Sequence, residues 1–303
     1  RAQSLLELRA LSGVEISDQG GPWVAAVIDS AEPEELIERI SAAESRERRL
    51  TVEPAALTEV RSLVRRFRPY GSALGSTISF LRRLLDALDD GATLTRNEVT
   101  RRFSIESGVP EELLRDDVPL RLEDVRDFLG TRVKGQGDAV ARVAQVVAVV
   151  KANLADPARP VATLLFAGPT GVGKTELTKA LAERVFGSKD RMVRLDMGEF
   201  SGPDALFRLV GDSYAEGFLS SAVRRQPFSV VLLDEIEKAH PAVFDALLSV
   251  LGEGRLTDGR GRTADFRSTI IVMTSNLGAQ TQRPRVGFGD EASGADVRAH
   301  YLS

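Results

Sequence analysis

The sequence contains no cysteine and only two histidines among its 303 residues. A disulfide framework, a thiolate metal site and a cysteine nucleophile are therefore excluded for this chain. The absence of cysteine fits a reducing compartment, so we expect a cytoplasmic protein, although cysteine-free proteins also occur in oxidised compartments.

Long apolar runs are also missing. The longest runs, such as 143–150 and 230–233, are too short to span a bilayer and are flanked by charged residues, so no membrane partner is expected. The first residues lack the pattern of a signal peptide. Because the sequence begins at Arg1 without a methionine and stops at Ser303 without any terminating pattern, we interpret it as part of a longer protein.

The composition is that of a soluble globular protein, with 43% hydrophobic and 28% charged residues. Its length suggests about two domains. The net charge of -4 argues against an overall surface for polyanions, although a local basic patch is compatible with it. We therefore expect no nucleic-acid partner.

The first part of the chain, to about Leu129, has the apolar spacing of helices. Thr95 followed by Glu98 resembles a capping box that opens one of them. Trp23 to Ile28 is the one run typical of a strand. The expected helices are 34–46, 54–67 and 78–88. This pattern predicts a small, mainly helical domain.

The second part alternates short β-type runs with helical segments. Such alternation predicts an α/β domain with a parallel sheet covered by helices on both faces. Ligands of these sheets bind beyond the carboxyl ends of the strands, and the polar motifs of this chain fall there. The expected strands are 163–166, 192–195, 230–233 and 269–273, and the expected helices include 174–185 and 243–251.

A glycine-rich motif follows the first of these strands and opens a helix. It matches the pattern G-x-x-x-x-G-K-[ST] of a P-loop, whose backbone N–H groups surround phosphates. Lys174 is expected to reach the β- and γ-phosphates of ATP, and Thr175 to ligate Mg²⁺. The alternative is a glycine-rich turn that binds nothing. The candidate nucleotide-binding residues are Gly168, Pro169, Thr170, Gly171, Val172, Gly173, Lys174, Thr175 and Glu176.

Two acids, Asp234 and Glu235, end a buried strand. Paired acids are costly there unless they face a cation or water, so Asp234 suits a magnesium shell and Glu235 suits a general base. The alternative is a solvated strand end. Asn276 follows the last strand, where its amide can orient the attacking water or serve as an ordinary turn residue.

Two further segments have simpler interpretations. His240 precedes a helix, and a role at the helix start is favoured over a catalytic or metal role because the only other histidine is His300. The segment Arg255 to Arg267 is dense in glycine and charge, so it is either a solvated hairpin or a loop that contacts a polymer in a pore.

The run SVVLLDEIEKAHP, from Ser229 to Pro241, closely resembles the second ATPase domain of the Clp family of AAA+ proteins. The segments GRLTDG at 254–259, MTSN at 273–276 and RLDMGEF at 194–200 resemble it too. The resemblance implies an AAA+ P-loop fold and a homo-oligomer, most simply a hexameric ring, that hydrolyses ATP to unfold or thread protein substrates. In the family, Asn276 would be a sensor of the γ-phosphate.

The resemblance also implies a domain order. Residues 1–21 are unassigned, 22–106 resemble the small helical subdomain that closes a first ATPase domain, 107–128 resemble a linker, and 129–303 resemble a large ATPase subdomain that stops before its C-terminal end. Val133 and Lys134 occupy the position that brackets adenine in the family, where Lys134 departs from the usual aliphatic residue.

The chain departs from the family in three further ways. Between Gly211 and Glu216 the family carries an aromatic pore loop, and here only Asp212-Ser213-Tyr214-Ala215 is present. Either residues of a mobile loop are missing or the grip has been lost, and we favour the first because such loops are often disordered. The family's trans-acting arginine finger and its sensor arginine would lie beyond Leu302, and no P-loop precedes the helical region.

Three classes of function follow. The first is an ATP-driven protein unfoldase or disaggregase, in which Val286-Gly287-Phe288 would either dock on a peptidase ring or fold back on its own domain. The second is a Clp-derived switch or scaffold that does not thread substrate, which the short segment between Gly211 and Glu216 suggests. The third, a helicase or clamp-loader-like ATPase, is disfavoured by the acidic net charge and by the motif at 238–241.

Overall fold

The structure is a computed structural model that describes residues 33–67 and 73–276. By its internal contacts the chain divides into two compact units, residues 1–103 and 104–303. The strand-like run Trp23 to Ile28 and the tripeptide Val286 to Phe288 lie outside the described residues. The domain boundaries expected from the resemblance stay predictions.

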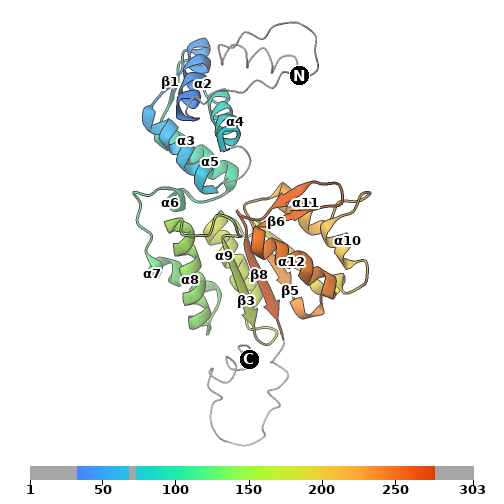
Figure 1. Ribbon diagram of the computed structural model, residues 1–303. Coiled ribbons are helices and arrows are strands. Elements are labelled where there is room, and N and C mark those ends of the chain that lie inside the picture. The colour runs from blue at the N-terminus through green and yellow to red at the C-terminus, as the bar shows by residue number, and fades with distance from the viewer. Residues whose placement is uncertain (1–32, 68–72, 277–303) are drawn as a thin grey trace, which may run out of the picture. The chain divides into compact units, whose positions relative to one another are not determined.

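The first unit is mainly helical, as expected (Figure 1). Its aromatic core centres on Phe103, which is fully buried and lies 5.5 Å, ring centre to ring centre, from both Phe67 and Phe80. The Thr95 hydroxyl accepts a hydrogen bond from the backbone N–H of Glu98 at 3.2 Å, which confirms the predicted helix start. Its elements are α2 (Pro33–Arg48), β1 (Thr51–Val52), α3 (Pro54–Phe67), α4 (Ala73–Asp86), β2 (Thr93–Leu94) and α5 (Arg96–Ser107).

The second unit contains the alternating helices and strands. Each of the four predicted strands is present, and so are the two predicted helices, α9 and α12. The elements are α6 (Glu111–Leu114), α7 (Leu122–Arg132), α8 (Gly137–Ala152), β3 (Ala162–Ala167), α9 (Lys174–Phe186), β4 (Met192–Asp196), η1 (Met197–Phe200), α10 (Ala205–Val210), α11 (Phe218–Arg225), β5 (Val230–Asp234), η2 (Ile236–Lys238), α12 (Pro241–Glu253), β6 (Arg255–Thr257), β7 (Thr263–Asp265) and β8 (Ile270–Ser275).

Four strands form one sheet in the order β3-β8-β5-β4, and all neighbouring pairs are parallel. The register aligns their carboxyl ends, because Ala167 pairs with Ser275 and Asp196 pairs with Asp234. The last strand among the described residues, β8, lies in the interior of the sheet between β3 and β5. The residues that follow β3, β5 and β8 therefore meet at one edge of the sheet.

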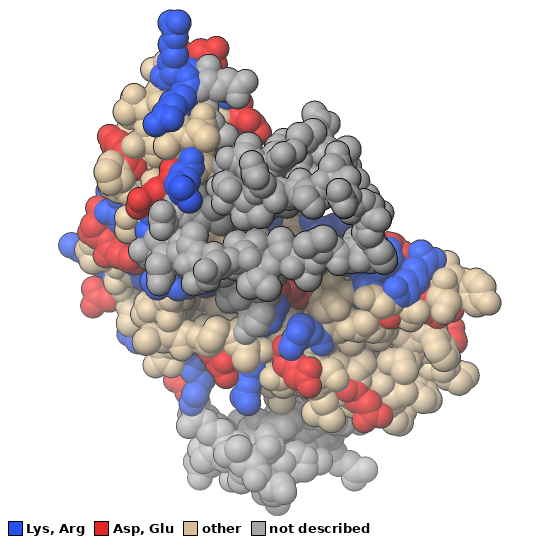
Figure 2. Space-filling model, turned by 45° about the horizontal axis from the view of Figure 1, so that its top comes forward, with Lys and Arg blue, Asp and Glu red and all other residues tan. Residues whose placement is uncertain are grey.

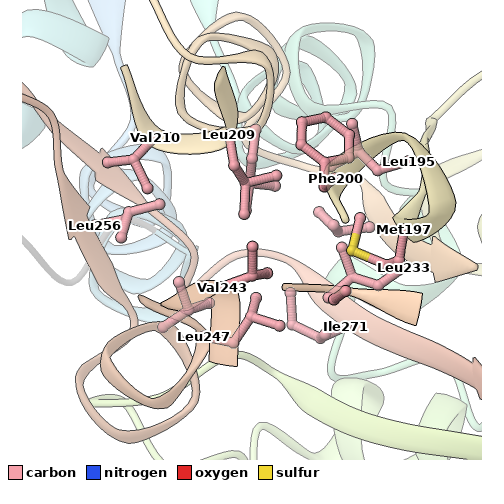
Figure 3. Close-up of a cluster of buried hydrophobic side chains, with 14 of the residues drawn as sticks. Leu195, Met197, Phe200, Leu209, Val210, Leu233, Val243, Leu247, Leu256 and Ile271 are labelled. Carbon is pink, nitrogen blue, oxygen red and sulfur yellow. The ribbon is translucent and has the colours of Figure 1, made fainter. Parts of the chain in front are cut away.

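Both faces of the two central strands, β8 and β5, are largely buried. Val231, Leu233 and Ile271 point to one face, where they join side chains of α10, α11 and α12 in a single apolar cluster (Figure 3). Residues alternate between faces along a strand, so the equally buried Leu232 and Val272 point to the opposite face, where α9 contacts β4 and β5. The predicted α/β architecture, a parallel sheet between helices, is confirmed.

The surface of the described residues carries charges of both signs. On the face shown in Figure 2, acidic and basic side chains are interspersed rather than separated into patches. Among the described residues, no helix combines the length and the apolar character needed to cross a bilayer.

Candidate functional site

The glycine-rich loop connects the end of β3 to the start of α9. Gly171 and Gly173 have φ values of 87° and 98°, a left-handed conformation that favours glycine. A Cβ atom on Gly173 would lie 3.0 Å from Cγ1 of Val133, so this position also lacks room for a side chain. The N–H groups of Gly171, Val172 and Gly173 donate to no group within the described part of the chain. These N–H groups therefore remain available to an anion.

Lys174 begins α9 and turns back over the loop. Its Nζ donates to the carbonyl oxygens of Gly168 at 2.6 Å and Pro169 at 3.0 Å, and to Oδ1 of Asn276 at 2.8 Å. Burial lowers the pKa of the Lys174 ammonium, and the nearby carboxylates of Asp234, Glu237 and Glu235 oppose that shift only in part. A phosphate that replaced the three neutral oxygens would strengthen the contacts of this cation.

Asn276 joins the lysine to the acids. Its Nδ2 donates to Oε1 of Glu235 at 2.7 Å, and its backbone N–H donates to Oε1 of Glu237 at 3.0 Å. The structure thus brings together Lys174, Glu235 and Asn276, three residues that are far apart in sequence. Glu235 itself has a φ of 57°, a conformation that is uncommon for a residue other than glycine and often marks a functional site.

Asp234 is buried at the end of β5, and both of its carboxylate oxygens accept hydrogen bonds. Oδ1 accepts from the Thr274 hydroxyl at 2.5 Å, and Oδ2 accepts from the Arg194 guanidinium at 2.6 Å. The same Thr274 oxygen accepts from the backbone N–H of Glu235 at 2.9 Å. The fully buried Thr274 hydroxyl is therefore hydrogen-bonded both to the Asp234 carboxylate and to the Glu235 backbone.

We predict that Thr274→Val destabilises the chain by about 1–3 kcal/mol. Valine has the shape of threonine but leaves Oδ1 of Asp234 and the Glu235 N–H without the Thr274 hydroxyl as partner. The urea midpoint of unfolding checks this, with Thr163→Val as the control, because Thr163 is exposed on the neighbouring strand β3. Equal midpoints for both variants would contradict the assigned role of the hydroxyl.

Lys238 contacts the second oxygen of Glu235. Its Nζ lies 2.5 Å from Oε2 of Glu235, three residues earlier in the chain. The hydrogen bond and charge of Glu235 raise the pKa of the Lys238 ammonium, with Asp196 and Glu237 adding to the effect. Glu235 is thereby held by Asn276 on one side and Lys238 on the other.

The oxygen donors suit Mg²⁺ when a nucleotide supplies the remaining ligands. Asp234 and Thr175 offer one carboxylate and one hydroxyl, and Mg²⁺ is commonly bound by one or two carboxylates together with phosphates and water. No group of three or more metal-ligating acids or histidines occurs among residues 33–67 and 73–276. The described residues therefore do not form a metal site whose ligands all come from the protein.

The remaining predicted contacts lie around the loop. Val133 is buried beside Gly173, next to the glycine-rich loop. Lys134 and Thr170 are exposed. Glu176 is exposed on the first turn of α9 and pairs with Lys179 at 3.5 Å. Contact of these residues with a nucleotide stays a prediction.

His240 caps a helix. Its Nδ1 accepts a hydrogen bond from the backbone N–H of Ala242 at 3.2 Å at the start of α12. This contact confirms the helix-start interpretation.

The segment between Gly211 and Glu216 closes as a tight turn. Gly211 and Glu216 form an antiparallel bridge, and the carboxylate of Asp212 accepts from the backbone N–H groups of Tyr214 and Ala215, each at 2.7 Å. The four residues of the turn complete the connection between α10 and α11. The preferred interpretation, that residues of a mobile loop are missing here, stays a prediction, because these contacts describe only the four residues that are present. Tyr214 is 90% exposed on the turn.

The hairpin β6–β7 is present, and its loop is bonded to this turn. Arg260 donates to the carbonyl oxygen of Tyr214, and Arg262 pairs with Glu216. In the same network, the buried carboxylate of Asp258 accepts from Arg262 at 3.0 Å and from Arg224 at 3.1 Å. The hairpin loop and the turn are thus held as one charge-linked unit.

This network predicts a pH-dependent stability. Burial alone would raise the pKa of Asp258, but the N–H groups of Arg262 and Arg260 and the Arg262 guanidinium lower it. The stabilisation is therefore present above the ordinary aspartate pKa of about 3.9 and is lost as the pH falls through the lowered value. We expect Asp258→Asn to reduce the urea midpoint at pH 7 and to differ progressively less from the parent below about pH 4.

The control for that experiment is Asp245→Asn, because Asp245 is an exposed residue of α12. A difference between Asp258→Asn and the parent that stays constant from pH 7 to the acid limit would contradict the ionised role of Asp258.

Sequence reasoning missed three residues of the site. Arg194, Thr274 and Lys238 each contact an acid of the pair, yet none received a role. A signal existed for two of them, because an arginine is uncommon near the end of an otherwise apolar strand, and a lysine three residues after an acid can pair with it. Thr274 carried no such signal.

Comparison with known proteins gives consistent matches. Residues 159–298 match the AAA domain (Cdc48 subfamily). The chain is 50% identical over 194 residues to the chaperone protein ClpB of Brucella suis biovar 1, which covers 62% of this chain and 22% of that protein. It is 49% identical over 198 residues to the ATP-binding subunit ClpC of the Clp protease of Staphylococcus epidermidis, which covers 63% of this chain and 24% of that protein.

Solved structures match more of the chain at lower identity. A structure of the S. cerevisiae Hsp104-ADP complex superposes with a TM-score of 0.71 at 29% identity and covers 89% of this chain and 48% of that one. A structure of the S. cerevisiae Hsp104:casein complex superposes with a TM-score of 0.70 at 28% identity, with the same coverage. The chain thus spans about a quarter of the curated relatives and about half of the solved chains.

Proposed function

We propose that this chain is a Clp-type AAA+ ATPase, which the family match of residues 159–298 and the ClpB, ClpC and Hsp104 similarities support, and that it binds Mg²⁺·ATP at the glycine-rich loop and hydrolyses it to remodel protein substrates. The observation that carries the proposal is the bonded series Lys174–Asn276–Glu235 at the carboxyl edge of the sheet. It supports the proposal because a cation, a polar amide and a carboxylate lie together in one small region.

Each residue has a defined task in this proposal. The N–H groups of residues 171–173 and the Lys174 ammonium bind the phosphates, and Val133 and Lys134 contact the base of the nucleotide. Thr175 and Asp234 would hold Mg²⁺, which neutralises charge on the phosphates. Glu235 accepts a proton from the attacking water, and Asn276 orients that water beside the γ-phosphate.

The proposed assembly is a homo-oligomer, most simply a hexameric ring, in the cytoplasm. Among the described residues, two cations belong to or contact the Lys174–Asn276–Glu235 series, namely Lys174 and Lys238, and neither is an arginine. An arginine supplied by a neighbouring subunit would stabilise the transition state and contributes about 10³–10⁵ in rate where it occurs. The proposed hydrolysis is therefore slow in an isolated subunit.

The test is phosphate release by the purified chain as a function of ATP, Mg²⁺ and protein concentration. We expect Mg²⁺-dependent turnover whose rate per subunit rises as the chain associates, with size-exclusion chromatography coupled to light scattering giving the oligomeric state. Failure of fluorescent ATP analogues to bind at any protein concentration would refute the proposal.

A second candidate is favoured by one observation, the closed turn between Gly211 and Glu216. A loop that grips and pulls a polypeptide must reach into a pore and move with the nucleotide state, whereas this turn is short and is bonded to the β6–β7 hairpin loop. The alternative is that the ATPase acts as a nucleotide-gated switch or assembly scaffold without threading.

The two candidates differ in one measurement. A threading motor unfolds a tagged fluorescent protein in an ATP-dependent reaction, and Tyr214→Ala would slow that unfolding without changing ATP turnover. A switch leaves the fluorescent protein folded while it still hydrolyses ATP. A peptidase ring as partner through residues 286–288 stays a separate proposal.

A further inference from the structure

The connection between α7 and α8 begins directly beside the glycine-rich loop. Val133, the residue that ends α7, is buried, and its Cγ1 lies 3.0 Å from the position that a Cβ atom on Gly173 would take. Gly173 is in turn the residue from which α9 starts. The residues that follow Val133, at 134–136, therefore leave from the edge of the loop to which we assign the phosphates.

This connection leaves its backbone polar groups without protein partners. Within the described part of the chain, the N–H groups of residues 134–136 and the carbonyl oxygens of Val133, Lys134 and Gly135 form no hydrogen bond. Backbone groups of this kind are completed by water or by a ligand. A short stretch that offers both donors and acceptors can pair with the polar edge of a nucleotide base.

Lys134 adds an unpaired cation to the same stretch. Its side chain is exposed, and no residue of 33–67 or 73–276 forms an ion pair or a hydrogen bond with it. The neighbouring Arg132 is engaged instead, because its guanidinium lies 3.8 Å from the ring centre of Phe128 and pairs with Glu183 at 2.8 Å. Lys134 is thus the cation of this connection whose donors all remain available.

The purine bases differ at the edge that such a cation would meet. Guanine presents O6 and N7 side by side, and both are acceptors, whereas adenine presents N7 beside the donating N6 amino group. An ammonium donates and cannot accept. It therefore gains more from a purine with an oxygen at position 6 than from adenine, whose amino group opposes its approach.

We propose that Lys134 is a specificity-determining residue that extends the nucleotide site from ATP to 6-oxopurine triphosphates, GTP among them. The proposal rests on the function proposed above, in which Val133 and Lys134 contact the base. Lys134 donates to O6 and N7 of the 6-oxopurine, and the backbone groups of 134–136 remain for the other polar atoms of either purine. The loop that takes the phosphates is the same for both nucleotides.

The test is equilibrium binding, measured as displacement of a fluorescent ADP analogue from the purified chain by ATP, GTP and ITP with Mg²⁺. We expect all three to displace it. Lys134→Met keeps the length of the side chain and removes the ammonium. It is expected to weaken GTP and ITP about three- to ten-fold more than ATP, the lower part of the range for a base-edge contact, because the lysine is exposed.

ITP locates the contact on the base. Its base lacks the 2-amino group of guanine but keeps O6 and N7, so an equal loss for GTP and ITP assigns the contact to those two atoms. A loss for GTP alone would overturn that assignment. Lys134→Arg retains a donating cation and is expected to preserve the parent order of affinities.

Lys189→Met is the matched control, because Lys189 is an exposed lysine that follows α9 and its loss changes the net charge equally. It should leave the ratio of GTP to ATP affinity at the parent value. If Lys134→Met weakens ATP, GTP and ITP by one common factor, Lys134 attracts the triphosphate and does not read the base, and the inference is wrong. An unchanged ratio overturns it as well.

The same titrations separate the two ways of failing. If neither the fluorescent analogue nor ATP binds the parent chain, the proposed function fails and the inference fails with it. If ATP binds while GTP and ITP do not, the nucleotide site stands and the extended specificity alone is wrong. Lys174→Ala is expected to weaken all three nucleotides, which would show that GTP and ITP use the glycine-rich loop.

Discussion

Replacement of Glu235 by glutamine is expected to lower the rate of ATP hydrolysis about 100- to 10,000-fold, the contribution typical of a general base. Glutamine keeps the size of the side chain and an oxygen that accepts from Asn276, but it cannot take a proton from water. ATP therefore stays bound, and the variant should accumulate in the ATP-loaded state. Single-turnover hydrolysis and equilibrium binding of a fluorescent ATP analogue separate the two effects.

Glu253→Gln is the matched control, because Glu253 is an exposed acid at the end of α12. It loses the same charge from the same unit and should retain the parent rate. Undiminished hydrolysis in Glu235→Gln would remove Glu235 as the base. Loss of binding together with hydrolysis would mean that the substitution had disturbed the loop instead.

Replacement of Lys174 by alanine is expected to weaken ATP binding about 10- to 100-fold, since one or two charge-assisted hydrogen bonds to phosphate are lost. The variant also loses the three contacts that Lys174 makes with Gly168, Pro169 and Asn276. Isothermal titration with ATP and with AMP gives the measurement. AMP affinity should change least, because AMP lacks the β- and γ-phosphates.

Lys179→Ala on the same helix serves as control, and its affinity for ATP should remain near the parent value. Its single described contact is the pair with Glu176 at 3.5 Å. An equal loss of ATP affinity in the two variants would indicate a general effect of charge on α9 rather than a contact between Lys174 and phosphate.

The parts of the site that the sequence predicted are those with local patterns. The loop at 168–175, the acids at the end of β5 and Asn276 each lie where an apolar strand stops, and that position is visible in the order of residues. The predicted parallel sheet indicated that these residues belong to one site, because the carboxyl ends of its strands share an edge.

The missed residues depend on neighbours in space. Thr274 reaches Asp234 because β8 lies beside β5, and Arg194 reaches it because β4 lies on the other side of β5. No single segment of the sequence predicts that strand order. The short segment after Gly211 is a different case, because the bridge to Glu216 shows how the four residues present are arranged but does not test whether loop residues are missing.

The Thr274 hydroxyl has a consequence beyond stability. A backbone N–H can only donate and an ionised carboxylate can only accept, so the hydrogen bonds from Glu235 through Thr274 to Asp234 run in a single direction. Bonds in such a chain polarise one another. A cation that binds Asp234 is therefore expected to polarise the same series of hydrogen bonds that ends at the Glu235 backbone N–H.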